Sequence, residues 1–428
     1  MPGRPLTRRT TVGAALLAPL AVAACDIDPP ARDDGSADPT PPPPEDSELV
    51  AAVVAALVLS TVGSGTAAAK ETTGEQRRLQ AALDELRDLG AAGAQGQVSA
   101  GRRDTTARSG VADLTTGAPM PATGAFRIGS DTKTFVSVVL LQLIGEGRIR
   151  LDDTVERWLP GTVSGNGNDG RRVTVRHLLQ HTSGIANYIG DMVALASREG
   201  FLAHRFDHYD PADLVAMAMR HPPAFAPGTH WDYSNTNYVL AGMIIKEVTG
   251  QSWAEQVRRR ITGPLGMRDT FFPGDRATLP GRAARSYQQF TPGGALLDVT
   301  EFNATAADAG GGLVSSTADL NRFWRALQHG RLLRPAQQAE LHRTVLAETL
   351  QDIRPGMRYG LGVFEVPTAC GRFWGHPGDV PGTSTFNGVD DAGDTAVVVY
   401  RTTALADPAV NGAMDLRVMR LVDDVMCR

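Results

Sequence analysis

The chain has 428 residues, of which 42% are hydrophobic and 21% are charged, so it can bury a large core in one unit or in two interleaved lobes. Its 47 acidic and 42 basic residues leave a net charge of -5. A nucleic-acid-binding protein usually carries a strongly basic domain or stripe, so no nucleic-acid partner is expected.

The first 25 residues have the pattern of a bacterial export signal. Arg8 and Arg9 precede an apolar stretch at 12–24, and Val-Ala-Ala-Cys at 22–25 resembles a lipobox. In that pattern the cysteine receives lipid after cleavage, which makes Cys25 a candidate membrane tether. We therefore expect 1–25 to be a signal peptide, and the protein to be extracytoplasmic, either secreted or lipid-anchored to the outer face of the cell membrane.

Residues 26–73 are expected to form a disordered linker outside the fold. The part up to residue 48 is rich in Asp, Glu and Pro, a composition that cannot bury a core. An apolar run follows at 49–69, but it is short and Ala-rich for a membrane span, which needs about 20 strongly apolar residues. The run is compatible with a remnant signal peptide, a weak membrane contact or an Ala-rich linker, and the sequence leaves these three open.

Hydrophobic periodicity predicts the elements of the remaining domain, residues 74–428. The N-terminal part reads as an amphipathic helix at 74–89 and two strands near 96–101 and 106–113, followed by a buried helix at 130–144. A mainly helical stretch at 150–325 precedes the last elements, which are strands near 359–366, 371–375, 383–389 and 395–401 and a helix at 406–425. Since strands lie at both ends, the expected fold class is α+β: an antiparallel sheet built from N- and C-terminal segments, flanked by helices, with an inserted mainly helical lobe.

Lysine is rare in this chain, and one lysine is well placed for chemistry. Lys70, Lys133 and Lys246 are the three lysines among 42 basic residues. An amine can lose its proton and act as a base, whereas a guanidinium cannot. Lys133 follows Ser130 by three residues, so both would share a helix face, with Ser130 as nucleophile and Lys133 as base. Taken alone, this tetrapeptide fits an N-cap serine and a surface lysine better.

Two further motifs carry polar groups at suitable positions. Tyr-Ser-Asn at 233–235 could present a phenol and an amide on one side of a loop, or else Tyr233 packs the loop and Asn235 caps a helix near residue 237. His-Pro-Gly-Asp at 376–379 lies beside a predicted strand, whose backbone could pair with an extended acyl substrate, or else it is a simple turn. Cys370 and Cys427 could pair in an oxidising compartment or remain free thiols.

In this order and spacing, the motifs resemble the Ser-x-x-Lys, Ser-Asp-Asn and Lys-Thr-Gly set of the penicillin-recognising serine hydrolases. The resemblance spans roughly 75–428 and is closest to secreted D-alanyl-D-alanine carboxypeptidases, with class C β-lactamases and related esterases as cousins. The segments that carry it are FRIGSDTKTF at 126–135, VTVRHLLQHTSG at 173–184, PGTHWDYSNTNYVLAGMIIKEVTG at 227–250, GGLVSSTADL at 311–320, RYGLGV at 358–363 and WGHPG at 374–378.

The resemblance implies a role for each motif residue. Ser130 would be acylated, Lys133 would be its base, and Tyr233 would carry protons to the leaving group and activate water. Asn235 would bind the substrate amide. The third motif would bind substrate through His376, which replaces the usual lysine, and through Gly378 and Asp379, with the backbone N–H groups of Ser130 and Asp379 as oxyanion hole. Cys370 and Cys427 match the positions of a disulfide in the carboxypeptidases.

Three departures affect the recognition of a terminal carboxylate. The carboxypeptidases bind it with an arginine and two threonines, at positions occupied here by Phe364, Pro377 and Asp379. Phe364 has no charge, Pro377 has neither a hydroxyl nor an N–H, and an ionised Asp379 would repel a carboxylate. A protonated His376 could compensate. The acyl-transfer machinery thus resembles that of the family, whereas carboxylate recognition is expected to be impaired.

The leading hypothesis is an exported serine hydrolase that forms an acyl-enzyme and resembles the D-alanyl-D-alanine carboxypeptidases in acting on cell-wall peptides or related amides and esters. The alternatives are an esterase, an amidase or a class C-like β-lactamase whose substrates lack a recognised carboxylate. A small peptide, amide or ester is the expected substrate, β-lactams are candidate ligands, and no cofactor or metal is expected. A non-catalytic binding protein remains open, as does a metallohydrolase using His204 and His208 or His177 and His181.

Overall fold

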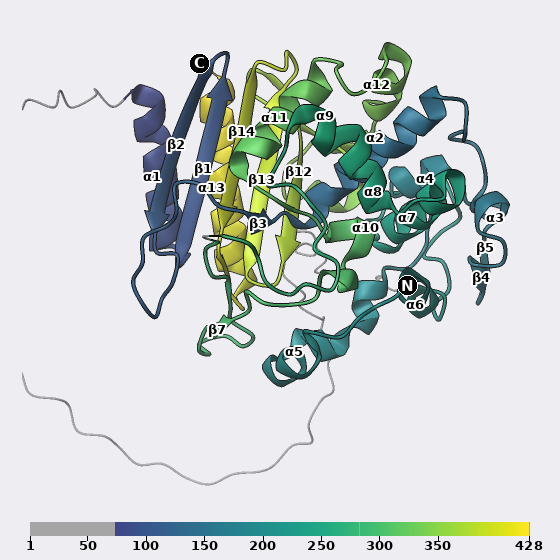
Figure 1. Cartoon of the computed structure of the whole chain (residues 1–428), viewed down its shortest axis with the longest axis horizontal. Coiled ribbons are helices and arrows are strands. Elements are labelled where there is room, and N and C mark those ends of the chain that lie inside the picture. Colours follow the sequence, from purple (N-terminus) through teal and green to yellow (C-terminus); the bar gives the residue numbers. More distant parts are fainter. Residues whose placement is uncertain (1–72, 282, 428) are drawn as a thin grey trace, which may run out of the picture. The chain divides into compact units, whose positions relative to one another are not determined.

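The computed structural model describes residues 73–281 and 283–427 (Figure 1). The expected signal peptide, nearly all of the linker, the apolar run and Cys25 lie outside the described residues. Within the described residues, no helix has the length and hydropathy needed to cross a membrane.

The centre of the domain is an eight-stranded sheet that both ends of the chain build together, as the sequence predicts. Its strand order is β2-β1-β14-β13-β12-β11-β10-β9, and all neighbours are antiparallel. The strands are β1 (Gly93–Ala100), β2 (Arg103–Gly110), β9 (Val345–Leu346), β10 (Arg358–Tyr359), β11 (Phe364–Thr368), β12 (Gly371–Val380), β13 (Thr383–Asp390) and β14 (Thr395–Arg401).

Two boundaries differ from the prediction. The first two strands begin three residues early, because the hairpin turns at Gly101 and Arg102, where Gly101 has φ +57 and Ala100 already pairs with Arg103. Strand β12 continues to Val380. The His-Pro-Gly-Asp motif therefore lies within a strand and not in a turn beside one.

The two faces of the sheet belong to two cores. Along β14, Val397 and Val399 face the core formed with α1 (Gly74–Asp88) and α13 (Pro408–Met426), which pack on each other. The intervening Ala396, Val398 and Tyr400 face the other core, which contains α11 (Thr317–Gln328) and α2 (Thr132–Gly145). This alternation is what the period of a strand requires when both faces are buried. Figure 1 shows α1 and α13 apart from the helical lobe.

Helix α2 is the centre of the helical lobe. Nearly all of its side chains are buried, including Val136, Val138 and Leu140, because apolar residues cover every side of it. The other helices are α3 (Val155–Trp158), α4 (Val175–Leu179), α5 (Arg198–His204), α6 (Pro211–Ala218), α7 (Thr236–Thr249), α8 (Trp253–Val257), α9 (Gly263–Leu265), α10 (Asp308–Gly311) and α12 (Pro335–Leu341).

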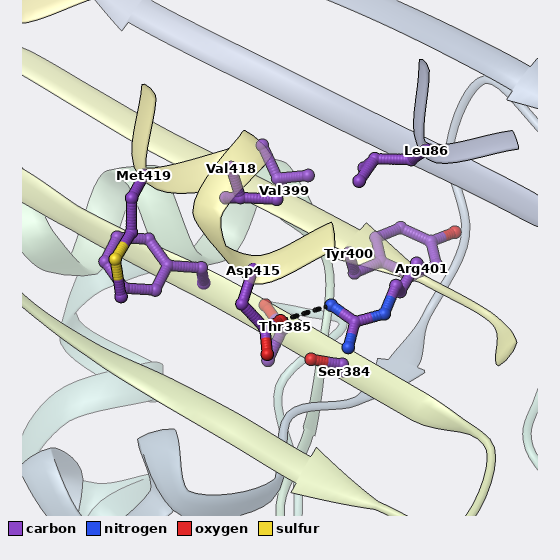
Figure 2. A pocket seen from close by; sticks show the side chains of 10 residues that line it. Leu86, Ser384, Thr385, Val399, Tyr400, Arg401, Asp415, Val418 and Met419 are labelled. Atoms are coloured by element: carbon purple, nitrogen blue, oxygen red, sulfur yellow. Dashed lines mark hydrogen bonds and ion pairs between the residues drawn. The ribbon is translucent and has the colours of Figure 1, made fainter. Parts of the chain in front are cut away.

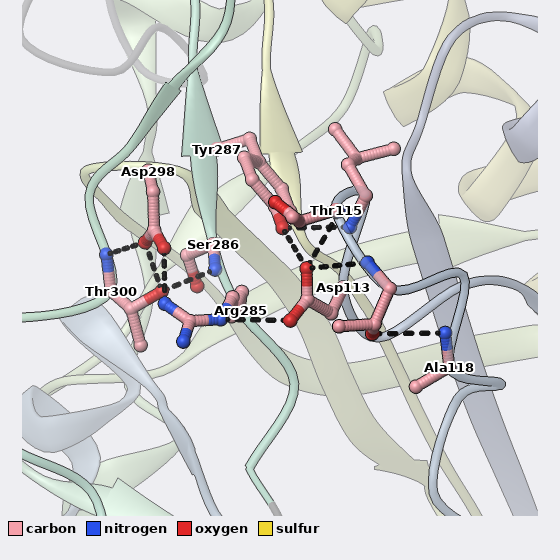
Figure 3. A network of polar contacts seen from close by, with 10 residues as sticks. Asp113, Thr115, Ala118, Arg285, Ser286, Tyr287, Asp298 and Thr300 are labelled. Atoms are coloured by element: carbon pink, nitrogen blue, oxygen red, sulfur yellow. Dashed lines mark hydrogen bonds and ion pairs between the residues drawn. The ribbon is translucent and has the colours of Figure 1, made fainter.

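Short strands complete the domain. The pair β3 (Phe126–Arg127) and β8 (Val314–Ser315) and a small sheet of β6 (Tyr287–Gln288), β7 (Leu297–Asp298) and β15 (Thr403–Ala404) lie between the sheet and the lobe, whereas the hairpin β4 (Ser164–Gly165) and β5 (Asn168–Asp169) lies at the far edge of the lobe (Figure 1). Figure 3 shows how Arg285 bridges Asp113, in the loop after β2, to Asp298 of β7. The Tyr287 hydroxyl also accepts from the N–H of Leu114, at 2.8 Å.

A disulfide joins Cys370, between β11 and β12, to Cys427 at the end of α13, across a separation of 57 residues. Loop-closure entropy predicts that this bond stabilises the domain by about 4 kcal/mol. The double variant Cys370→Ala/Cys427→Ala should lose about that much free energy of unfolding in a urea titration. Cys25→Ala, which leaves the pair intact, is the control. Equal urea midpoints for the double variant and the control would contradict the prediction.

Candidate active site

Ser130 lies in a 3-10 turn, η1 (Gly129–Asp131), directly before α2, and not in the helix itself. The turn packs closely on β12. Gly129 has φ +53, and a Cβ there would lie 2.7 Å from the backbone nitrogen of Asp379. A Cβ on Gly378 would lie 1.9 Å from the carbonyl oxygen of Ile128. The two glycines therefore let the backbone of the nucleophile turn approach the backbone of the third motif, where the oxyanion hole is expected.

Lys133 is wholly buried, with 0% of its surface exposed, and its amine meets three oxygens. Nζ lies 3.0 Å from Ser130 Oγ, 2.6 Å from Asn235 Oδ1 and 2.6 Å from the carbonyl oxygen of Gly310. Burial holds the pKa of Lys133 well below its usual value, although the Asp131 carboxyl works in the opposite direction. The surface lysine that the tetrapeptide alone favours is therefore wrong for this chain.

The three oxygens determine where a neutral Lys133 amine directs its N–H groups and its lone pair. The oxygens of Asn235 and Gly310 can only accept, so a neutral amine gives them its two N–H groups. Its lone pair is then left for the hydroxyl of Ser130. A half-buried serine whose hydroxyl meets a neutral amine is an activated nucleophile.

Tyr233 is the second polar group at Ser130. Burial raises the pKa of its phenol well above the usual value, and a hydrogen bond with Ser130 has a smaller effect in the opposite direction. The amine of Lys133 lies 4.8 Å from the centre of the Tyr233 ring. In the resting site Tyr233 is therefore a protonated phenol, which can supply a proton to a leaving group.

Asn235 holds Lys133 instead of capping a helix. It occupies the N-cap of α7, but its side chain makes no capping hydrogen bond. Its backbone N–H donates to Asn187 Oδ1 at 3.2 Å, and its Nδ2 lies 3.4 Å from the same oxygen. Asn187 thus orients Asn235. Asn187 belongs to none of the three motifs, and its one sequence signal is that it lies three residues after the HTSG segment at 181–184.

His376 is neutral, which corrects the expectation that it could supply a positive charge. Burial is the main reason that its pKa is lowered to about 3. Its Nδ1 lies 2.6 Å from the carbonyl oxygen of Pro377, which can only accept, so the proton sits on Nδ1. Its Nε2 then accepts from the hydroxyl of Tyr359 at 3.1 Å. Both ring nitrogens are occupied, and neither can bind a carboxylate as a cation.

Asp379 belongs to a row of polar residues across three strands. It pairs in register with Ser384, and Ser384 pairs with Arg401. Arg401 forms a buried ion pair of 2.6 Å with Asp415 of α13, which Figure 2 shows beside a small pocket. Burial and the negative charge of Asp415 raise the pKa of Asp379 to about 7. The carboxyl is therefore only partly ionised at neutral pH, and its repulsion of an anion depends on pH.

Phe364 occupies the position at which the carboxypeptidases have an arginine, so this position carries no positive charge. Phe364 is 1% exposed and packs in an aromatic cluster, with its ring centre 4.5 Å from that of Tyr359 and 5.1 Å from that of His376. The two nearest arginines in the sequence are held elsewhere. Arg358 donates to Thr344 Oγ1 at 2.8 Å, and Arg372 pairs with Asp391 at 2.9 Å.

The histidine pairs considered as metal ligands have other partners. His204 lies 2.8 Å from Asp207, and His208 lies 2.6 Å from Asp275, both on the surface. His177 takes part in the capping box of α4. Among the residues that the structure describes, no group of three or more His, Cys, Asp or Glu side chains could hold a metal ion.

The fold and this site define the class of penicillin-recognising and β-lactamase-like serine hydrolases. The chain belongs to the Beta-lactamase family, whose family model matches residues 76–422. The individual roles of Ser130, Lys133, Tyr233 and Asn235 stay predictions, although the structure brings these four residues together.

Two curated relatives differ in the activity that their names state. One is Penicillin-binding protein 4* of Bacillus subtilis (strain 168), 29% identical over 64% of this chain and 60% of that protein. The other is Esterase EstB of Burkholderia gladioli, 34% identical over 48% of this chain and 54% of that protein. The chain thus spans little more than half the length of these relatives.

Solved structures match over more of their length. A D-stereospecific amidohydrolase from Streptomyces sp. is 39% identical, with a TM-score of 0.73, over 78% of this chain and 97% of that one. The D-amino acid amidase from Ochrobactrum anthropi SV3 is 27% identical, with a TM-score of 0.72, over 82% of this chain and 98% of that one.

Proposed function

We propose that this protein is a serine hydrolase that cleaves amides or esters through an acyl-enzyme on Ser130, and that its substrates lack a free carboxylate on the leaving group. The observation that carries the proposal is the buried Lys133, whose amine lies 3.0 Å from Ser130 Oγ and whose pKa is held well below its usual value, next to a third motif that offers no cation. The similarity to the D-stereospecific amidohydrolase and the D-amino acid amidase favours amides of D-amino acids as the substrate class.

Acylation requires two proton movements. Ser130 Oγ attacks the carbonyl carbon while its proton moves to Lys133 Nζ. The carbon–nitrogen bond then breaks, and the phenol of Tyr233 gives its proton to the departing nitrogen. The site then holds an ammonium and a phenolate close together, and these opposite charges stabilise each other.

Deacylation reverses both movements. Tyr233 takes a proton from water, and the resulting hydroxide attacks the ester carbon. The bond to Ser130 Oγ breaks, and Lys133 returns its proton to that oxygen. The oxyanion of each tetrahedral intermediate is expected to accept from the backbone N–H groups of Ser130 and Asp379.

The site of action is part of the proposal. We infer that the domain works outside the cytoplasm, with Cys25 as its lipid tether. The Cys370–Cys427 disulfide supports this inference, since such bonds persist in oxidising compartments.

A substrate panel tests the proposal. We expect purified protein to hydrolyse D-phenylalanine amide and D-phenylalanine methyl ester with kcat/KM at least about tenfold above their L-enantiomers. A D-Ala-D-Ala peptide and a chromogenic cephalosporin should be poorer substrates. Ser130→Ala should abolish turnover, whereas Ser164→Ala, the same change at an exposed serine of β4, should not.

Three other outcomes would replace the proposal. Preferred turnover of the D-Ala-D-Ala peptide would identify a carboxypeptidase, and preferred turnover of the cephalosporin would identify a β-lactamase. If a reactive acyl probe labels neither the protein nor its Ser164→Ala variant, a binding protein that retains the fold becomes the better description.

A further inference from the structure

A buried histidine lies against the ring of Tyr233. His181, two residues after the end of α4, has 0% of its surface exposed. Its ring centre is 4.2 Å from that of Tyr233, with the planes tilted by 38°. The other rings around Tyr233, those of Tyr359, His376 and Trp231, lie at least 6.3 Å away. His181 is thus the aromatic neighbour that limits how the Tyr233 ring can turn.

His181 also holds the backbone on both sides of Tyr233. Its carbonyl oxygen accepts from the N–H of Asp232 at 3.0 Å, and its Nδ1 accepts from the N–H of Ser234 at 3.3 Å. The residues before and after the tyrosine are therefore tied to one histidine. The main chain and the ring of Tyr233 are fixed by the same residue.

The orientation of the imidazole is itself determined. Asn237 Oδ1 accepts from Ser183 Oγ at 2.6 Å, so the amide group presents its Nδ2 to His181 Nδ1, at 3.1 Å. Nδ1 therefore accepts two N–H groups, and the proton of the neutral ring is on Nε2. Burial lowers the pKa of His181 well below its usual value, which keeps the ring neutral beside the amine.

The arrangement costs free energy locally. His181 has φ +60, a backbone conformation that residues with a side chain rarely adopt. Its buried Nε2 has no hydrogen-bond partner among the described residues. Strained backbone and an unpaired buried polar atom persist where the surrounding structure or the function requires them.

We propose that His181 is a positioning residue that holds the Tyr233 phenol in the orientation needed for proton transfer to the leaving group. It acts through Tyr233 and does not touch the substrate. The proposal rests on the proposed function, because it assumes that Tyr233 protonates the group that departs. The proposal gives a role to the HTSG segment, which is not one of the three motifs of the site.

Leaving-group chemistry separates this role from a purely structural one. A p-nitroanilide needs a proton on nitrogen as it departs, whereas p-nitrophenolate leaves an ester without one. With the same D-phenylalanyl group on both, His181→Asn should slow acylation by the anilide by about a hundredfold, within the range of lost acid catalysis. The rate of acylation by the ester, measured as the burst of p-nitrophenol, should decrease less than about tenfold in the same variant.

Two variants and two controls make the test decisive. Asn tolerates a positive φ, and His181→Gly removes the backbone strain altogether, so the glycine variant serves if the asparagine variant does not fold. His177→Asn, the same change at the histidine of the α4 capping box, controls for lost stability. Tyr233→Phe should show the same selective loss on the anilide, and its effect should not add to that of His181→Asn.

If His181→Asn lowers the rate of acylation equally with the anilide and the ester, or lowers it with neither, the positioning role of His181 is overturned. Failure of the proposed function would look different. If Tyr233→Phe itself shows no preference between the two leaving groups, or if Ser130→Ala still forms the acyl-enzyme, the mechanism is wrong, whatever His181 does.

Discussion

Lys133→Arg is expected to lower the rate of acylation at least about a thousandfold, within the range attributed to loss of a catalytic base. In its neutral form, the amine of Lys133 gives two N–H groups to oxygens that only accept and directs its lone pair at Ser130. A guanidinium has no lone pair to offer and stays protonated. It is also larger, and Lys133 has no exposed surface toward which it could shift.

Labelling by a serine-directed acyl probe, followed by mass spectrometry over time, measures this effect. Lys246→Arg is the matched control, since it makes the same change at an exposed lysine of α7. Circular dichroism should show that both variants fold. Acylation of Lys133→Arg at a rate near that of the wild type would refute the role of Lys133 as base.

The second large effect concerns the leaving group. Between two substrates with one acyl group, the one whose leaving group carries a free carboxylate should have a kcat/KM at least about tenfold below that of its amide, the cost of roughly one charge-assisted hydrogen bond. A desolvated carboxylate needs a cation or several donors. Phe364 and Pro377 provide neither, and His376 is neutral.

This preference should depend on pH through Asp379. The pKa of Asp379 is raised to about 7, so below pH 7 its carboxyl is mostly neutral, and above pH 7 it is mostly negative. The preference for the amide over the acid should therefore grow as pH rises through about 7. Asp379→Asn should remove the pH dependence of the ratio, whereas Asp424→Asn, at an exposed carboxyl of α13, should keep it.

Either of two results would show that the leaving-group interpretation is wrong: a higher kcat/KM for the acid, or a ratio that does not change between pH 5 and pH 9.

The arginine of the carboxypeptidases is not a useful replacement here. Phe364 is 1% exposed within an aromatic cluster, so Phe364→Arg would bury an unpaired charge and test stability instead of specificity.

Hydrophobic periodicity and the three motifs by themselves determined the fold class and the family resemblance of this protein. The amphipathic pattern of α1, the largely apolar α2 and the strands at both ends correctly predicted the α+β fold with its sheet shared by the two ends of the chain. The sequence pattern predicted turns less accurately. The first hairpin turns at Gly101, so its two strands begin three residues earlier than predicted.

Only the tertiary structure decided the state of each group. The lowered pKa values of Lys133 and His376 and the raised pKa of Asp379 all follow mainly from burial, and burial depends on segments that lie far apart in the sequence. Gly310, whose carbonyl oxygen accepts from Lys133, lies 177 residues away from it in the sequence. His181, whose Nδ1 accepts from the N–H of Ser234, lies 53 residues away from Ser234. Such pairs leave no periodic trace in the sequence, because their contact is made by the fold and not by their spacing along the chain.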